Sequence, residues 1–368
     1  MSSLKHLVAL AAAAGALALV PACESFAQPA AAPAAAAPAA AAPAAAAPAA
    51  GARGGRGRGP VEFWYINKGK GGVYTPPMKP LWKMADLIAA HRGQNNWSQQ
   101  IIKDGLQDVT YNSAAPGTKI TPRMHIETAV AFVVIRGEMH FTVEGQQPVT
   151  ATRGGIVNIM QDTIYSYDVQ GSQNALWVEI HPFFYQTVTP ASAPPPPPQA
   201  GKVLTKVSFS HRPGAYTGNN KLYFNLFDAL ANCQPVSNVV VDDHIVVNPL
   251  LGYVNPADNK CNPGQTGNIG SGPLKPGAPA FNPNSTFGHL HQSNIEWWVV
   301  QSGQIRGQFE GTGEFHAVEG DILYAAPDMW HQMAAEAPSG PNVRTAMSAY
   351  PITNMGNTEN PGRGRAGR

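Results

Sequence analysis

Apolar positions along the chain come in short runs separated by glycine, a pattern typical of strands rather than of helices. Between residues 61 and 190, these runs predict strands at Ala129–Arg136, Met139–Glu144, Ile156–Met160 and Leu176–Phe184. Between residues 201 and 353, they predict strands at Glu296–Gln301, Ile305–Glu310, Ile322–Ala325 and Asn342–Tyr350. One short helix is expected at Leu81–Arg92. The pattern favours an all-β fold of two tandem double-sheet (jelly-roll) barrels with little helix.

Proline-rich segments divide the chain. Residues 28–60 hold an Ala-Ala-Ala-Ala-Pro repeat followed by Gly and Arg, and a composition that cannot bury a core predicts a disordered spacer. Residues 191–200 contain five consecutive prolines and predict a stiff linker. The predicted domains are therefore an N-terminal barrel at 61–190 and a C-terminal barrel at 201–353, followed by a disordered Gly/Arg tail at 354–368.

The N-terminus has the features of an export signal over residues 1–27. Lys5 precedes an apolar stretch at Leu7–Val20, and Ser25-Phe26-Ala27 forms a small-x-small cleavage site. The alternative is a lipoprotein signal in which Cys23 is acylated and tethers the protein to a membrane. Both interpretations predict a periplasmic or secreted protein.

Export changes what the remaining cysteines predict. Once Cys23 is removed or lipidated, Cys233 and Cys261 are left as an even pair in an oxidising compartment. We expect them to form a disulfide, with two free thiols as the alternative.

Composition and charge exclude several classes of protein. A hydrophobic content of 43% excludes disorder of the whole chain, and no apolar run reaches the ~20 residues of a membrane-spanning helix. Residues 1–59 carry a net charge of +3 and residues 354–368 of +2, so the +2 of the whole chain leaves −3 for residues 60–353. A nucleic-acid partner is not expected, because the basic residues lie in the tails rather than on the folded part.

The most informative stretch is Gly288-His289-Leu290-His291-Gln292-Ser293-Asn294-Ile295-Glu296. Two histidines two positions apart on a strand point to the same face, and Glu296 begins the next strand. Downstream, Gly320-Asp321-Ile322-Leu323 leads through Pro327 to His331. Three imidazoles and one carboxylate inside a barrel are a suitable ligand set for a divalent metal, and they leave positions open for water, oxygen or substrate. The alternative is a set of buried, hydrogen-bonded histidines.

The spacing of these residues resembles the two motifs of the cupin family. The resemblance is specific over about 286–335 and covers the body of the chain more weakly, as a two-cupin (bicupin) protein. It implies a germin-like site in which His289, His291, Glu296 and His331 bind one divalent transition metal, Fe, Mn, Cu or Ni. The family's second motif has Pro-x-Gly-x-x-His, whereas Pro327-Asp328-Met329-Trp330-His331 is one residue shorter and lacks the glycine.

The first half has the barrel pattern but not the ligands. Aligning Gly137 with Gly303 places His125 on His291, Arg123 on His289 and Val130 on Glu296, and aligning Gly154 with Gly320 places Tyr165 on His331. One ligand of four remains. His125 and Glu127 could share a face, joined by His140 or His181, but we expect a metal-free barrel with a structural or small-molecule-binding role.

Strand alternation predicts the surroundings of the metal. If Glu296 points inward, so do Trp298 and Val300, while Trp297 points out, and His331 brings Met333 inward with it. Trp298, Met333 and Trp330 are the candidate substrate-pocket residues. Such an apolar pocket suits an aromatic or other flat substrate. Trp298 as plain barrel core is the alternative. Asp328 could transfer protons, although an Asp that forms a turn is the more ordinary role.

These observations favour an exported, metal-dependent oxidoreductase, a dioxygenase that brings O₂ and a small aromatic or phenolic substrate together, with Glu296 as ligand and catalytic residue. The family resemblance implies oxalate-degrading enzymes and flavonol dioxygenases as models, and the single site argues against the oxalate version. Two alternatives stay open: a binding protein without turnover, and a non-redox isomerase or lyase. Barrel edges also leave a homo-oligomer open.

Overall fold

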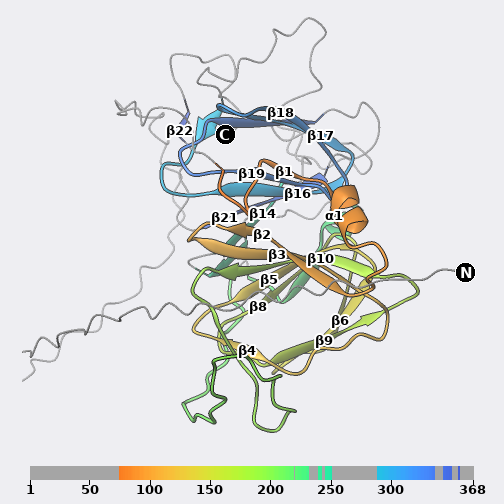
Figure 1. Ribbon diagram of the computed structural model, residues 1–368, viewed down its shortest axis with the longest axis vertical. Helices are drawn as coiled ribbons and strands as arrows, with labels where there is room; N and C mark the ends of the chain where they lie inside the picture. The colour runs from red at the N-terminus through yellow and green to blue at the C-terminus, as the bar shows by residue number, and fades with distance from the viewer. Residues whose placement is uncertain are drawn as a thin grey trace, which may run out of the picture. The chain divides into compact units, whose positions relative to one another are not determined.

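The computed structural model describes residues 74–218, 220–231, 239–242, 245–250, 288–335, 343–349 and 355–356, drawn in colour in Figure 1. Strands dominate these residues, whose helices are the short α1 (Met84–Ala90) and α2 (Leu226–Ala231). The predicted all-β fold with little helix is confirmed. Among the same residues, the helices are too short to cross a membrane.

The first barrel consists of two layers of antiparallel strands. Its strands are β2 (Trp97–Lys103), β3 (Gln107–Ala114), β4 (Met124–Ile126), β5 (Val130–Arg136), β6 (Glu138–Val143), β7 (Val149–Thr152), β8 (Gly155–Ile159), β9 (Tyr165–Gln170), β10 (Ala175–Pro182) and β11 (Gln186–Val188). The larger sheet has the order β12-β8-β5-β10-β3-β2, where β12 is Tyr223–Asn225 (Figure 1). The sheets β7-β6-β9 and β11-β4 form the other layer.

Strand β5 is buried on both of its faces. Alternate residues from Val130 to Val134 pack with β6 and β9 inside the first barrel, whereas Ala131 and Val133 belong to a second apolar cluster shared with the other barrel. A strand covered on both sides needs an apolar residue at every position. This double burial explains the unbroken apolar run of β5.

The second barrel repeats the architecture. Its strands are β13 (Val239–Asp242), β14 (Ile245–Leu250), β15 (His289–Leu290), β16 (Glu296–Ser302), β17 (Gln304–Phe309), β18 (Gly313–Val318), β19 (Ile322–Ala325), β20 (His331–Ala335), β21 (Val343–Ser348) and β22 (Met355–Gly356). One sheet has the order β1-β19-β16-β21-β14-β13, where β1 is Leu81–Trp82, and the other has the order β18-β17-β20-β15-β22. Trp298, Val300, Phe309 and Leu323 pack in the interior.

The two barrels share a buried interface that is apolar except for a few hydrogen-bonded side chains. Gln107 is fully buried there, donates to the carbonyl of Ser348 at 3.0 Å and accepts the indole N–H of Trp297 at 2.8 Å. The hydroxyl of Tyr324 donates to Asp104 at 2.9 Å. Trp297 therefore points out of its own barrel, as predicted, but into the neighbouring barrel rather than into solvent.

Strand pairing crosses the predicted domain boundary in both directions. Leu81 and Trp82, from the first half of the sequence, pair with β19 of the second barrel. Strand β12, from the second half, pairs with β8 of the first barrel. The linker at 191–200 is irregular and largely exposed. The division of the chain at this linker remains a prediction. The larger sheet of each barrel contains one strand from the other side of the linker.

The eight predicted strands are confirmed as β5, β6, β8, β10, β16, β17, β19 and β21, with small shifts at their ends. The sequence pattern missed strands rich in polar residues, above all β3, whose Gln107, Asn112 and Ser113 are nevertheless buried.

The helix predicted at Leu81–Arg92 is wrong in its first turn. Leu81 and Trp82 form β1 because the edge of β19 offers them backbone partners. The helix begins at Met84, whose N–H donates to the carboxylate of Asp321 at 2.9 Å, and it ends at Ala90, ahead of Gly93 with its left-handed φ of +83°.

The prediction of a disordered tail at 354–368 is wrong for Met355 and Gly356. They form β22 and pair with Leu290 and His289, because the edge of β15 offers them backbone partners. The predicted export signal, the spacer, Cys233 and Cys261 lie outside the described residues.

Candidate metal centre

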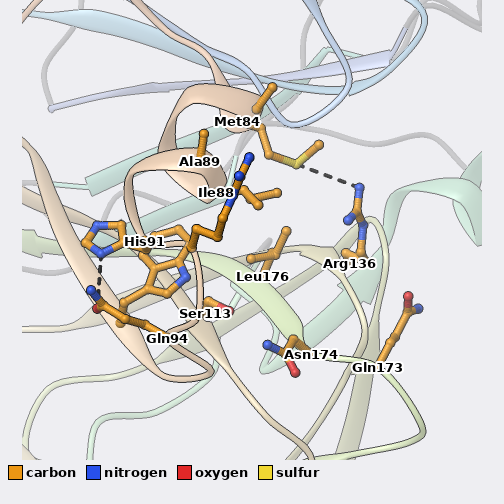
Figure 2. A pocket seen from close by; sticks show the side chains of 14 residues that line it. Met84, Ile88, Ala89, His91, Gln94, Ser113, Arg136, Gln173, Asn174 and Leu176 are labelled. Carbon is orange, nitrogen blue, oxygen red and sulfur yellow. Dashed lines mark hydrogen bonds between the residues drawn. The ribbon is translucent and has the colours of Figure 1, made fainter.

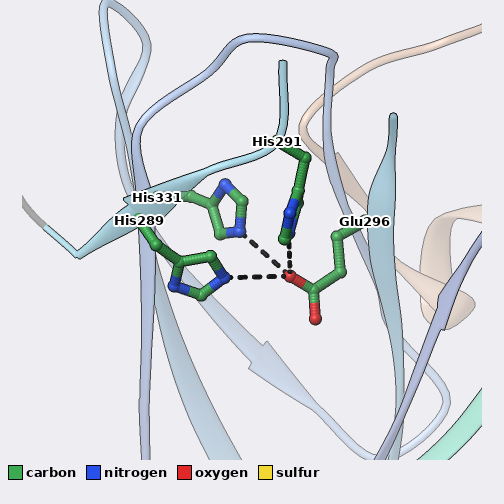
Figure 3. A group of neighbouring side chains, drawn as sticks. All are labelled: His289, His291, Glu296 and His331. Atoms are coloured by element: carbon green, nitrogen blue, oxygen red, sulfur yellow. Dashed lines mark hydrogen bonds and ion pairs between the residues drawn. The ribbon is translucent and has the colours of Figure 1, made fainter. Parts of the chain in front are cut away.

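The four predicted metal ligands converge at one end of the second barrel (Figure 3). His289 lies on β15 and pairs directly with His331, the first residue of β20. His291 follows β15, and Glu296 begins β16 in the opposite sheet. Both sheets of the barrel thus contribute ligands, which is why residues distant in the sequence meet.

Glu296 is the centre of the group. Its Oε2 atom lies 2.9 Å from Nε2 of His291, 3.1 Å from Nε2 of His331 and 3.3 Å from Nε2 of His289. One candidate ligand atom from each residue lies within 4.8 Å of all the others. Figure 3 shows the three imidazole rings turned toward the same carboxylate oxygen. The group could supply the first coordination sphere of a metal ion, with one donor atom from each residue.

Burial differs among the ligands. His291 and His331 are buried, and the side chain of Glu296 is 12% exposed. The side chain of His289 is 32% exposed, so the group is reached from its side. A site that is enclosed on three sides and open at one edge can take an exogenous ligand.

The protonation states suit a cation. Burial raises the pKa of Glu296, but the three imidazoles around it outweigh burial and hold the pKa well below its usual range. Burial, with the neighbouring His289, lowers the pKa of His331 to about 4. At neutral pH the carboxylate is therefore ionised and the His331 ring is neutral.

The tautomer of His331 follows from its second nitrogen. Nδ1 lies 2.8 Å from the carbonyl oxygen of Met329, which can only accept, so Nδ1 carries the proton. Nε2 of the neutral ring then points a lone pair at the ionised oxygen of Glu296, 3.1 Å away. Two acceptors facing each other repel unless a cation lies between them. The donor set therefore fits a divalent metal ion.

The backbone near the ligands explains both the glycine and the shortened motif. Gly288 has a φ of +65°, and a Cβ there would overlap the carbonyl oxygen of His331. Asp328 has a φ of +63°, and its N–H donates to the carbonyl of His291 at 2.7 Å. Asp is among the few residues that adopt this left-handed conformation. Asp328 thus forms the turn for which the cupin motif uses glycine, in agreement with its predicted role as a turn residue.

The predicted pocket residues differ in their positions. The ring of Trp298 is buried with its centre 5.3 Å from that of His331, and Met333 belongs to the same interior cluster. Trp330 is also buried, but it is not part of that cluster, and its backbone pairs with Glu310. Trp298 and Met333 therefore line the interior beside the ligands.

The first barrel holds a second group of titratable residues at the equivalent place. Arg123 forms a bridge with Tyr165, the same register as His289 with His331, which agrees with the alignment made from the sequence. His125 lies 2.8 Å from the hydroxyl of Tyr165. The carboxylate comes from Glu179 on β10, and His181 on the same strand lies 2.9 Å from it.

A guanidinium already compensates the acid of this second group. Arg123 donates to Glu179 at 2.7 Å and to the Tyr165 hydroxyl at 2.9 Å. Ligand atoms of His125, Glu179 and His181 lie within 4.8 Å of one another, so the group could hold a metal by distance alone. A divalent ion would have to approach a fixed positive charge, and the group therefore fits a metal less well than its counterpart.

Sequence reasoning found only part of this group. His181 joins His125 as one of the alternatives suggested, but Glu127 is exposed and takes a left-handed φ of 58°, and His140 pairs with Thr150 instead. Glu179 was not anticipated, because it lies on a strand far along the sequence from His125. The available indication of a special role was that Glu179 is a charged residue in β10, a strand that is buried along its whole length.

A cleft of about 620 Å³ lies beside α1 (Figure 2). Ile88, Trp97 and Leu176 contribute apolar walls, and His91 stacks on Trp97 with ring centres 4.6 Å apart. Arg136 reaches into the cleft toward the sulfur of Met84. No residue predicted as part of a site lines this cleft.

Comparisons with known proteins concern the fold. No family model and no curated protein matches the sequence. The structure is similar to a cupin 2 conserved barrel domain protein from Leptotrichia buccalis, with 12% identity, a TM-score of 0.40, and coverage of 73% of this chain and 95% of that one.

Two further solved structures are similar at the same level. A salicylate 1,2-dioxygenase from Pseudaminobacter salicylatoxidans has 12% identity, a TM-score of 0.42, and coverage of 73% and 82%. Vicilin from Corylus avellana (hazelnut) has 11% identity, a TM-score of 0.39, and coverage of 75% and 87%. At these values the similarities carry no argument about activity.

The chain's own strands and side chains decide its fold. Two antiparallel double-sheet barrels lie in tandem, and the second brings together the three histidines and the glutamate of the motif. The protein therefore has the two-barrel cupin fold that its sequence motifs resemble.

Proposed function

We propose that this protein is an exported, metal-dependent dioxygenase whose second barrel acts on a small aromatic or phenolic compound. His289, His291, Glu296 and His331 would hold one divalent ion, Fe, Mn, Cu or Ni. The observation that carries the proposal is the convergence of three imidazole nitrogens on one oxygen of Glu296, at 2.9, 3.1 and 3.3 Å. Such a set of donor atoms fits a divalent transition metal.

The protein positions the reacting groups and excludes water from the site. When bound, such an ion supplies open coordination positions for O₂ and substrate. When both oxygen atoms of O₂ are added to the substrate across a cleaved carbon–carbon bond, the substrate supplies all four electrons and no outside reductant is required. The Met329 carbonyl fixes the His331 ring, and Trp298 excludes water from the inner side of the site. The exposed edge of His289 marks the side of entry.

Glu296 has a second proposed role as acceptor of a phenolic proton. With three imidazoles around it, its pKa is too low for this task. It becomes a better base when its contact with one histidine weakens, and His289, at 3.3 Å, makes the longest of the three contacts.

The test begins with the metal content of the mature protein purified without added metal. We expect about one ion per chain in the wild type and none in His289→Ala/His291→Ala. His316→Ala, at an exposed histidine of β18, is the matched control and should keep its metal. Phenols and hydroxybenzoates are then screened with an oxygen electrode. Absence of metal even after reconstitution would refute the proposal.

The same experiment separates the other two functions. A bound metal without any oxygen uptake would favour a binding protein. Conversion of a substrate under argon would favour a non-redox isomerase or lyase.

A further inference from the structure

Arg344 lies on the inner face of the second barrel. In the pairing of β16 with β21, Glu296 is opposite Ser348, Trp298 is opposite Ala346 and Val300 is opposite Arg344. Residues directly opposite each other on antiparallel strands project from the same face. Trp298, Val300 and Ala346 belong to the interior cluster, so Arg344 projects from the same inner face as Glu296, four positions further along β16.

The guanidinium of Arg344 has no protein partner among the described residues. Its Nε atom is buried without a hydrogen bond, and no described carboxylate forms an ion pair with it. Other arginines of the barrels have a carboxylate partner: Arg123 pairs with Glu179, Arg153 with Glu319 and Arg306 with Glu314, although the Nε of Arg306 is also buried without a hydrogen bond. Arg344 as a whole is half-buried, but a buried N–H without a partner is costly, and a ligand could supply the missing acceptor.

Charge balance indicates the sign of that ligand. Burial lowers the pKa of Arg344 to about 10, which leaves it charged at neutral pH, and the negative charge that acts on it most is that of Glu296. A divalent ion would bring two positive charges to a ligand set that holds one negative charge. Glu296 would then be fully compensated, and Arg344 would face the interior with an excess of positive charge around it. The charge balance of this interior therefore favours an anionic ligand.

The lining indicates the rest of the ligand. Ala346 lies between Arg344 and Ser348 on β21 and has the smallest of the three side chains. The rings of Trp298 and Phe309, 6.2 Å apart between centres, supply the aromatic surface of this interior. A planar body with one anionic end matches this combination.

We propose that Arg344 binds the carboxylate of the substrate and that the substrate is an aromatic monocarboxylic acid. This inference rests on the proposed function of the same site, whose substrate class it narrows. Arg344 is a binding and specificity residue, and the reacting part of the ring is directed toward His289, His291, Glu296 and His331.

The first test compares acids with neutral analogues of the same shape on metal-loaded wild-type protein. The three hydroxybenzoates and the three hydroxybenzamides are titrated by calorimetry and by the quenching of tryptophan fluorescence. We expect at least one acid to bind about 10- to 100-fold more tightly than its amide, the range of a charge-assisted hydrogen bond. Equal affinity of every acid and amide, or no binding of any acid, would overturn the inference. This comparison needs no variant.

The second test removes the charge. Arg344→Gln should lose that preference for the acid and keep the affinity for the amide, while Arg344→Lys should keep part of the preference. Arg306→Gln is the matched control, because Arg306 also lies in this barrel but pairs with Glu314. Each variant is checked for metal content and thermal unfolding. An unchanged acid preference in a folded Arg344→Gln protein would overturn the inference.

The outcomes also separate this inference from the proposed function. Acid binding through Arg344 without oxygen uptake would leave the inference standing and reject the dioxygenase. Oxygen uptake with neutral phenols that is unaffected by Arg344→Gln would support the dioxygenase and overturn the inference about Arg344.

Discussion

Arg123 and Tyr165 form in the first barrel the same antiparallel bridge that His289 and His331 form in the second. The two barrels thus keep one framework and differ in what they place on it. Where the second barrel has two imidazoles, the first has a guanidinium and a phenol, held 2.9 Å apart by a hydrogen bond. The first barrel carries its own cation, and a metal is expected only in the second.

Metal content should therefore respond to only one of two equivalent histidines. His291→Ala removes a donor 2.9 Å from Glu296 and should abolish metal binding, whereas His125→Ala, at the matching position of the first barrel, should leave about one ion per chain. Mass spectrometry of metals on the two purified variants checks this. Two ions in the wild type, with one lost in His125→Ala, would show that the first barrel also binds metal.

Arg123→Ala should destabilise the protein by about 3 kcal/mol, because Glu179 stays buried without its charged partner. Arg153→Ala is the comparison, since the Arg153–Glu319 pair is exposed and its loss should cost about 1 kcal/mol or less. Urea denaturation in the presence of a chelator measures both. Equal losses in the two variants would contradict the structural role of the Arg123 network.

Acid should weaken the first barrel in two stages. Burial, with His181 and Arg123 nearby, lowers the pKa of His125 from 6.5 to about 3. Because the unfolded chain binds the proton first, the stability from neutral His125 is fully present above pH 6.5 and is lost as the pH falls toward about 3.

The second stage belongs to Glu179. Burial raises its pKa, but Arg123 and His181 outweigh burial and lower the pKa from 4.5 to about 2. Its contribution is present above pH 4.5 and is lost as the pH falls toward about 2. Urea denaturation of the metal-free protein from pH 7.5 to 4 should show stability that is constant down to about pH 6.5 and declines below it. His125→Gln should make stability depend less on pH in the upper part of that range. If the dependence is unchanged in this variant, His125 is not the group responsible.

Gln107→Leu should cost about 1–3 kcal/mol, because it leaves the Trp297 N–H and the Ser348 carbonyl unpaired in the interface between the barrels. Gln100→Leu, at a half-buried glutamine that donates to Asp108, should change stability by about 0.5 kcal/mol. Thermal unfolding of the two variants provides the comparison. Similar small changes in both would show that Gln107 does not couple the barrels.

Export predicts a mature chain that begins after Ala27, or at a lipidated Cys23, with Cys233 and Cys261 joined. Intact mass and non-reducing peptide mapping of protein from the cell envelope and the medium check all three. Alkylation of both cysteines without reduction would reject the disulfide.

Sequence alone was sufficient where chemistry and pattern coincide. His289 lies on β15 and Glu296 begins β16, two strands that follow each other in the sequence, so these candidate ligands and His331 could be named without a structure. The apolar run of β5 likewise predicted a strand, because a strand buried on both faces has no polar positions.

Sequence was insufficient where the pairing of distant segments decides. Glu179 meets His125 only through the order of strands in the first barrel, and its neighbours in the sequence carry no motif. The alternation of β21 could place Arg344 on the inner face, but the lack of a protein partner for it is visible only in three dimensions. Strands of two residues, such as β1, are too short for any periodic pattern.

The exchange of β1 and β12 between the barrels has a consequence for any attempt to divide the protein. A gene cut at the proline run would produce two halves that each lack a strand of their own sheet and carry one that belongs to the other. Each half would expose unpaired sheet edges that favour aggregation. A protease that cuts the finished protein at the same place would leave the exchanged strands in their sheets, so the nicked protein should behave as a single particle.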